Sequence, residues 1–175
     1  MLVLVVGPSG AGKDTLLDAA RVALSDEANV RFARREITRP ATPGGEVHLP
    51  IDAASFSARR DSGGYALWWE AHGLEYGIPA DIVADLARGI TVVASVSRAV
   101  IAEAAGRFVV RVVEITAPPE VLAARLAGRG REDAADIARR LQRQVALPAG
   151  VEVVTVMNEG SVAEGAEKLR WAILP

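Results

Sequence analysis

The residues with the clearest chemical role lie near the start of the chain, where three glycines precede a lysine. Gly7, Gly12 and Lys13 match the G-x-x-x-x-G-K pattern of a phosphate-binding loop, the P-loop. Glycines let the backbone wrap until several N–H groups point at one anion, and the helix that follows adds the positive end of its dipole. The pattern therefore predicts phosphate binding by the segment Gly7, Pro8, Ser9, Gly10, Ala11, Gly12, Lys13, Asp14 and Thr15.

Lys13 is an exception to the basic composition of the chain, because arginine outnumbers lysine 18 to 2. A compact ammonium fits inside a cradle of backbone groups, whereas a planar guanidinium does not. Asp14 departs from the motif, since the residue after the lysine is normally Ser or Thr, whose hydroxyl holds Mg²⁺. The alternative interpretation of the motif is an ordinary glycine-rich turn between a strand and a helix.

Arginines gather in two places along the chain. The first group is Arg31, Arg34, Arg35 and Arg39, and the second is Arg125, Arg129, Arg131, Arg139, Arg140 and Arg143. In the second group the glycines around Arg129 interrupt a helical spacing. This arrangement suits a lid that closes cations over phosphates. The alternative is a solvated helix face whose arginines pair with nearby acidic residues.

The segment 67–77 combines aromatic and polar residues beside a glycine turn. Glu70, His72 and Tyr76 could hydrogen-bond a polar substrate there, and the alternative is a strand whose aromatic side chains fill the core. The two histidines, His48 and His72, are far apart in the sequence, which disfavours a metal site built on imidazoles.

Aliphatic runs alternate with helical spacings along the chain. Strands are expected at 2–6, 30–37, 65–71, 90–96, 109–115 and 151–157. Helices are expected at 15–25, 53–62, 79–88, 118–126, 133–145 and 161–173. This alternation, with the first strand leading into the P-loop, predicts a three-layer α/β fold with a mainly parallel sheet. Ligands of such sheets bind beyond the carboxyl ends of the strands.

Composition limits the classes of partner. A formal net charge of −2 over 175 residues excludes a broad nucleic-acid-binding surface. The absence of cysteine excludes disulfides and thiolate metal sites and fits a cytoplasmic protein. Gly7 interrupts the apolar N-terminus after six residues, so we expect neither a signal peptide nor a membrane span. The sequence does not indicate an oligomeric state.

Several motifs, in order and at similar spacing, resemble those of guanylate kinases. They are Gly7 to Lys13, Thr38-Arg39-Pro40, Glu70 to Gly73 with Tyr76-Gly77, Arg125 to Gly130, and Arg140-Leu141. The resemblance fails where guanine would be bound, because Thr42, Leu67 and Ile78 stand where that family has polar or charged guanine ligands. A site without its buried hydrogen-bonding partners loses discrimination by orders of magnitude.

The departures fit a sister family, the ribose 1,5-bisphosphate phosphokinases of phosphonate degradation. The matching segments are Gly12 to Asp14, Arg35 to Pro40, Trp69 to Gly77, Ser97 to Ala99 and Arg129 to Glu132. The resemblance implies a guanylate-kinase-like P-loop kinase that moves the γ-phosphoryl of ATP onto the 1-phosphate of ribose 1,5-bisphosphate, giving 5-phosphoribosyl 1-diphosphate (PRPP). Ser95 lies in a departure from this family, which has Asn-Gly before the Ser-Arg pair, so the contacts around it stay open.

The resemblance also implies roles for individual residues. Lys13 would contact the β- and γ-phosphates, and the lid clamp would be Arg125, Arg129, Arg131 and Arg140. The acceptor's two phosphates would be held by Arg35, Arg39 and Arg98, with Glu70, His72 and Tyr76 near the ribose. Asp14 would contact Mg²⁺ directly or through water, and Thr15 is a weaker candidate. No general base is expected, because an acceptor phosphate is largely anionic at neutral pH.

The resemblance covers nearly the whole chain, so we expect one kinase domain over residues 1–175. Its core would comprise 1–31, 80–125 and 139–175, with an acceptor-binding insertion at about 32–79 and a lid at about 126–138. One alternative function is that of a guanylate or other nucleoside monophosphate kinase. An alternative of another class is a guanylate-kinase-like binding module without catalysis.

Overall fold

A computed structural model describes residues 1–40, 47–127 and 147–174 of the chain. Its larger sheet comprises β1 (Leu2–Val6), β2 (Val30–Phe32), β7 (Thr91–Ser95), β8 (Val110–Thr116) and β9 (Glu152–Met157). The strand order is β2-β7-β1-β8-β9, and β2 pairs with β7, and β8 with β9, in parallel. The α/β fold with a parallel sheet is confirmed. The chain divides into two compact units.

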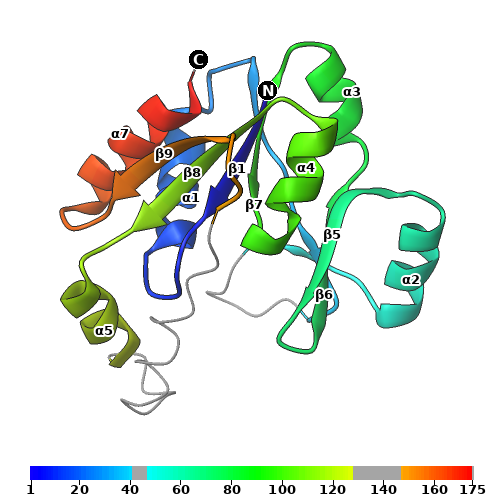
Figure 1. The fold of residues 1–175 in the computed structure, drawn as a ribbon, viewed down its shortest axis with the longest axis horizontal. Coiled ribbons are helices and arrows are strands. Elements are labelled where there is room, and N and C mark those ends of the chain that lie inside the picture. The colour runs from blue at the N-terminus through cyan, green and yellow to red at the C-terminus, as the bar shows by residue number, and fades with distance from the viewer. Residues whose placement is uncertain (41–46, 128–146, 175) are drawn as a thin grey trace. The chain divides into compact units, whose positions relative to one another are not determined.

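The first unit contains Met1–Leu4 and Ala28–Val110. It carries a second sheet, of order β4-β3-β6-β5, formed by β3 (Glu36–Ile37), β4 (Leu49–Pro50), β5 (Tyr65–Ala71) and β6 (Leu74–Pro79). Its helices are α2 (Ala53–Asp61), α3 (Ile82–Ala87), η1 (Arg98–Val100) and α4 (Ile101–Arg107). β5 and β6 form an antiparallel hairpin, and α2 lies against β5 (Figure 1). This sheet occupies the segment where an insertion is predicted.

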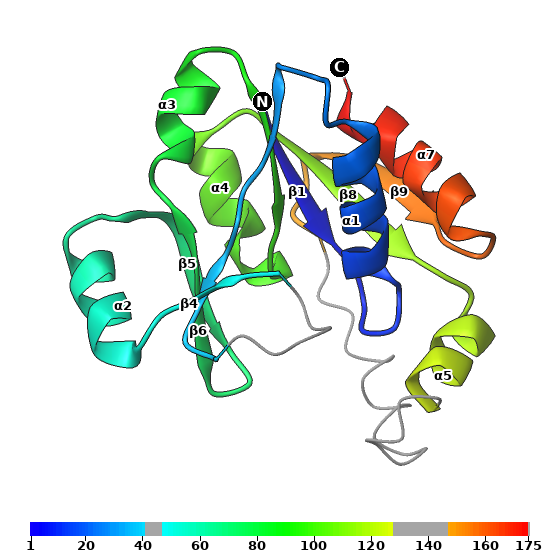
Figure 2. The same cartoon turned by 180° about the vertical axis from the view of Figure 1, so that it is seen from behind.

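The second unit contains Val5–Glu27 and the chain from Arg111 onward. Beside β8 and β9 it holds α1 (Lys13–Ala23), α5 (Pro119–Ala127) and α7 (Val162–Ile173), and α1 and α7 lie side by side (Figure 2). Gly165 permits this approach, because a Cβ there would be 2.7 Å from Cδ2 of Leu16. At the start of α7, Ser161 and Glu164 form a capping box that satisfies two backbone N–H groups.

The strand expected at 30–37 is wrong, because the segment contributes to two sheets. β2 ends at Phe32 after pairing with β7, and β3 begins at Glu36 and pairs with β4 and β6. The helix expected at 79–88 begins only at Ile82, because residues up to Pro79 belong to β6. Pairing with strands distant in the sequence determines both the division of 30–37 and the start of α3. Local hydrophobic periodicity does not predict such pairing.

Other expectations were incomplete or lie outside the described residues. The sequence did not predict β4, β6, η1 or α4, which are short or follow a preceding element closely. The helix expected at 133–145 and most of the lid lie outside the described residues. Among the described helices, none combines the length and apolarity that a membrane crossing requires.

A buried carboxylate joins α2 to the second sheet. Glu36 is only 5% exposed, and its two oxygens accept from Tyr65 Oη and from Arg59 Nη1, each at 2.6 Å. Phe56 stacks on Tyr65 with ring centroids 4.6 Å apart. Burial, reinforced by the bond to Glu36, raises the pKa of Tyr65 well above its usual value, so its hydroxyl stays a donor. These contacts fix which face of β3 is turned toward α2.

Arg31, a member of the first arginine group, has a structural role. Its guanidinium bonds Asp81 at 2.6 Å and also contacts Asp85, tying β2 to the start of α3. Asp81, and Asp85 after it, raise the pKa of Arg31. Arg31 and then Arg88 lower the pKa of Asp85. The positive charge of Arg31 is therefore paired with carboxylates of the fold.

Candidate functional site

The P-loop precedes α1 in the second unit and has the backbone that the glycine motif predicts. Gly12 is the N-cap of α1 and adopts a left-handed conformation with φ of 83°. No side chain caps the helix there, so its first-turn N–H groups are left for an anion. At Gly7 a Cβ would collide with the carbonyl oxygen of Ile115, so only glycine lets the loop run this close to β8.

The lysine and the acidic residue of the motif occupy neighbouring positions on α1. Lys13 Nζ donates to the carbonyl of Gly7 at 3.0 Å, so the ammonium lies within the loop. Asp14 and Thr15 are exposed in the first turn. Within the described residues there is no group of three His, Cys, Asp or Glu side chains that could hold a metal ion. A metal bound here would therefore depend on one carboxylate and on the ligand's phosphates, which is how Mg²⁺ commonly binds.

α5 lies against the P-loop and brings an arginine to it. A Cβ built on Gly10 would lie 3.2 Å from Cγ of Leu126, so the helix touches the loop directly. Arg125 Nη1 lies 3.9 Å from a Cβ built on Gly12. This nitrogen is buried and has no hydrogen-bond partner in the part of the chain that the structure describes. A buried cationic N–H beside the loop is suited to a phosphate oxygen. Arg129, Arg131 and Arg140 lie outside the described residues.

Asn158 contacts the P-loop, and the sequence analysis did not include it among the candidate residues. Its side chain is 6% exposed, and its Nδ2 donates to the carbonyl of Ala11 at 2.7 Å. Its own backbone N–H donates to Thr116 O at 2.7 Å, which fixes it just after β9. The available signal was its position, because a polar residue directly after a parallel strand faces the ligand edge of the sheet.

In the first unit, predicted acceptor residues follow two neighbouring parallel strands. Ala33 N donates to Val93 O at 2.8 Å, so the chain leaves β2 alongside β7. Arg35 follows β2, and Arg98 lies in η1 just after β7. Because parallel strands share one carboxyl edge, this edge carries both arginines. The segment after β3 is fixed by His48, whose Nε2 lies 3.0 Å from the carbonyl oxygen of Arg39.

The second sheet separates the predicted ribose contacts. Tyr76 pairs with Ile37 in β3 and with Trp69 in β5, and its ring stacks on Trp69 with centroids 5.3 Å apart. Glu36 alternates with Ile37 along β3 and so lies on the other face, toward α2. Glu70 pairs with Glu75 and is on the α2 face. The structure therefore places Tyr76 and Glu70 on opposite faces of the second sheet.

His72 occupies the tip of the β5–β6 hairpin. His72 and Gly73 have φ of 53° and 73° and connect the paired residues Ala71 and Leu74. Positive φ at both central residues is the requirement of a type I′ turn, which Asn-Gly satisfies best. His72 is exposed and is the one non-glycine residue with positive φ among those described. Its position thus has a backbone requirement independent of its imidazole.

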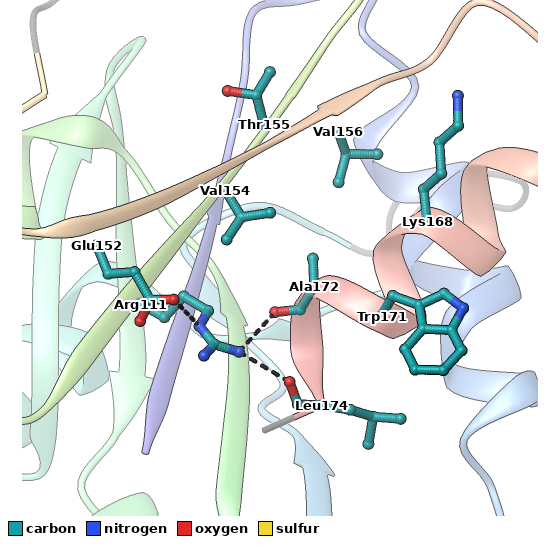
Figure 3. A pocket seen from close by; sticks show the side chains of 9 residues that line it. All are labelled: Arg111, Glu152, Val154, Thr155, Val156, Lys168, Trp171, Ala172 and Leu174. Carbon is teal, nitrogen blue, oxygen red and sulfur yellow. Dashed lines mark hydrogen bonds and ion pairs between the residues drawn. The ribbon is translucent and has the colours of Figure 1, made fainter.

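A cavity of about 530 Å³ lies between β9 and α7 (Figure 3). Arg111 in its wall bonds Glu152 at 2.8 Å and donates to the carbonyls of Ala172 and Leu174 at 3.3 and 2.9 Å. It thereby satisfies carbonyls at the carboxyl end of α7. Lys168 donates to the carbonyl of Met157 at 3.3 Å. Both cations have structural partners, which fits a cavity that belongs to the helix packing.

Curated relatives match the chain over most of its length. Ribose 1,5-bisphosphate phosphokinase PhnN of Brucella melitensis is 50% identical over 162 residues, covering 91% of this chain and 84% of the relative. The protein of that name from Acidiphilium cryptum is 51% identical, covering 94% and 88%. The chain belongs to the ribose 1,5-bisphosphate phosphokinase family. The family expected from the sequence motifs is confirmed.

The chain is also similar to part of a longer relative and to a solved structure of another kinase. A bifunctional ribose 1,5-bisphosphokinase-thymidine phosphorylase of Azorhizobium caulinodans is 48% identical over 99% of this chain, which spans 25% of that relative. Guanylate kinase from Anaplasma phagocytophilum has the same fold, with a TM-score of 0.64, 17% identity and coverage of 99% of this chain and 84% of that one. No protein-family model matches the chain.

Asn158→Ala tests how this phosphokinase-family chain holds its P-loop. Loss of the bond to Ala11 O should weaken binding of a fluorescent ATP analogue about fivefold, because one buried hydrogen bond contributes about 1 kcal/mol. Asn29→Ala is the matched control, since its side chain is exposed. Unchanged nucleotide affinity in Asn158→Ala would show that the loop keeps its shape without the amide.

His72→Asn and His72→Ala separate a backbone role from a ligand role. Both remove the imidazole, but only alanine is strained at positive φ, so only His72→Ala should lower the melting temperature. If His72 contacts the acceptor, both variants raise the KM of the acceptor several-fold by equal amounts, which is the result we expect. A KM that rises only in the destabilised alanine variant would make His72 a turn residue alone.

Proposed function

We propose that the chain transfers the γ-phosphoryl group of ATP to the 1-phosphate of ribose 1,5-bisphosphate, forming PRPP and ADP. The observation that carries the proposal is the P-loop with Arg125 beside it, in a chain about 50% identical to ribose 1,5-bisphosphate phosphokinases. Because the chain spans only a quarter of the bifunctional relatives, the proposal concerns the kinase activity alone.

The proposed step exchanges one phosphoryl bond for another. An oxygen of the acceptor's 1-phosphate attacks the γ-phosphorus, and the bond from that phosphorus to the bridging β–γ oxygen breaks. ADP leaves with the electron pair of that bond. The acceptor oxygen needs no base, since the second pKa of a phosphate monoester is about 6. Catalysis then depends on positioning and on positive charge along the transferred group.

The second unit would bind the nucleotide. The first-turn N–H groups of α1 and the ammonium of Lys13 would hold the β- and γ-phosphates, and Arg125 would donate Nη1 to a phosphate oxygen. Arg129, Arg131 and Arg140 remain part of the proposed clamp on the resemblance alone. Asp14 would hold Mg²⁺, which when bound neutralises charge on the β- and γ-oxygens.

The first unit would bind the bisphosphate acceptor. Arg35, Arg39 and Arg98 supply cations that suit its two phosphates, and Tyr76 lies on the face of the second sheet opposite to α2. His72 and Tyr76 remain candidates for the ribose. Glu70 is the weakest of the predicted contacts, because its pairing puts it on the α2 face. The acceptor is thus expected to lie on the Tyr76 face of the second sheet.

A coupled ADP-release assay with different acceptors tests the proposed function. We expect turnover with ribose 1,5-bisphosphate and none with GMP or other nucleoside monophosphates. Lys13→Ala should abolish turnover, whereas Lys168→Ala, which changes the other lysine of the chain, should retain it. Turnover with GMP alone would indicate a nucleoside monophosphate kinase, and turnover with no acceptor would favour a binding module.

Asp14→Ala tests the metal role of the acidic residue that follows the lysine. Removal of a carboxylate that holds Mg²⁺ should lower kcat or shift the Mg²⁺ titration to higher concentration. Asp18→Ala is the matched control, because Asp18 is exposed on the same helix and pairs with Arg21 at 2.8 Å. An Asp14→Ala titration that overlays the wild-type curve would remove Asp14 from the metal site.

A further inference from the structure

Ser95 ends β7, and its hydroxyl is buried without a hydrogen-bond partner among the described residues. The residue is 8% exposed, and its Oγ is shielded from solvent. A buried hydroxyl without a partner destabilises the fold, and alanine in its place would remove that penalty. The hydroxyl therefore has no stabilising function in this structure.

The position of Ser95 is where an α/β sheet binds its ligands. Ser95 is the last residue of β7. The carboxyl ends of β7 and of its parallel neighbour β2 lie at the same edge of the sheet. Arg35 follows β2 and Arg98 follows β7, so two arginines that are proposed to bind phosphate lie at this same edge. η1, which carries Arg98, also lies against β5 of the second sheet.

The neighbouring serine does not share this state. Ser97 Oγ accepts from Ala99 N at 3.3 Å and so caps η1. Ser97 has a local structural role, and Ser95 has none among the described residues. The contrast within one short segment singles out Ser95 as the hydroxyl that has a hydrogen bond left to make.

We propose that the Ser95 hydroxyl binds a ring hydroxyl of the sugar acceptor and so helps to select it; this inference rests on the proposed function. The phosphates of the acceptor are matched by arginines, which carry full charge. A serine hydroxyl is neutral and both donates and accepts, which matches a sugar hydroxyl. Because Oγ is covered in this structure, the bond forms only when the segment around it shifts to admit the acceptor.

Ser95→Ala tests this role with three acceptors: ribose 1,5-bisphosphate and its 2-deoxy and 3-deoxy analogues. For ribose 1,5-bisphosphate the variant should raise KM about fivefold, as expected for one hydrogen bond, and leave the KM of ATP unchanged. With the analogue that lacks the bonded hydroxyl, variant and wild type should have the same KM. The urea midpoint of the variant should be equal to or above that of the wild type.

Ser25→Ala is the matched control, because Ser25 is exposed just after α1 and bonds only at the surface. Equal KM values for ribose 1,5-bisphosphate in Ser95→Ala and wild type would overturn the inference and leave the proposed function intact. So would a penalty that persists with both deoxy analogues, or one that extends to ATP with a lowered urea midpoint. Absence of wild-type turnover would instead remove the proposed function itself, and this role with it.

Discussion

One amide side chain connects the P-loop to the end of β9. Asn158 Nδ2 donates to the carbonyl of Ala11 at 2.7 Å, and two glycines make room for that amide. A Cβ at Gly12 would be 2.5 Å from Nδ2, and a Cβ at Gly165 would be 3.2 Å from Oδ1. The end of β9, the start of α1 and the middle of α7 therefore meet at Asn158. A side chain added to either glycine would press on the group that holds the loop.

A second constraint, in the first unit, determines which side chains lie on each face of the second sheet. Glu36 is fixed by Arg59 and Tyr65 on the side of α2, each at 2.6 Å. Because side chains alternate along a strand, the neighbouring Ile37 lies on the opposite face, which it shares with Tyr76. That opposite face also packs into the core, because Ile37, Leu67 and Ile78 on it are fully buried. The buried carboxylate orients residues that it does not touch.

The sequence was a good guide wherever short-range geometry decides the structure. The aliphatic run Leu2–Val6, the P-loop and the strand Tyr65–Ala71 agree with expectation, because their signals are local. Its place directly after a strand could have marked Asn158 as a candidate, but its partner could not be predicted, because Ala11 is 147 residues away. The sequence did contain enough information to predict that Glu70 and Tyr76 lie on opposite faces of the hairpin. A two-residue turn at His72-Gly73 puts residue 70 opposite 75 and residue 69 opposite 76, and so fixes their faces.

Arginines show why composition alone could not define the site. Arg31, Arg59 and Arg111 each bond a carboxylate of the fold, and so tie elements together. The Nη1 of Arg125 is buried beside the P-loop and has no hydrogen-bond partner among the residues that the structure describes. A guanidinium paired with carboxylates of the same chain is already neutralised, whereas a guanidinium without such a partner can bind an anionic ligand. The local partner, which sequence spacing does not reveal, separates a structural arginine from one suited to phosphate.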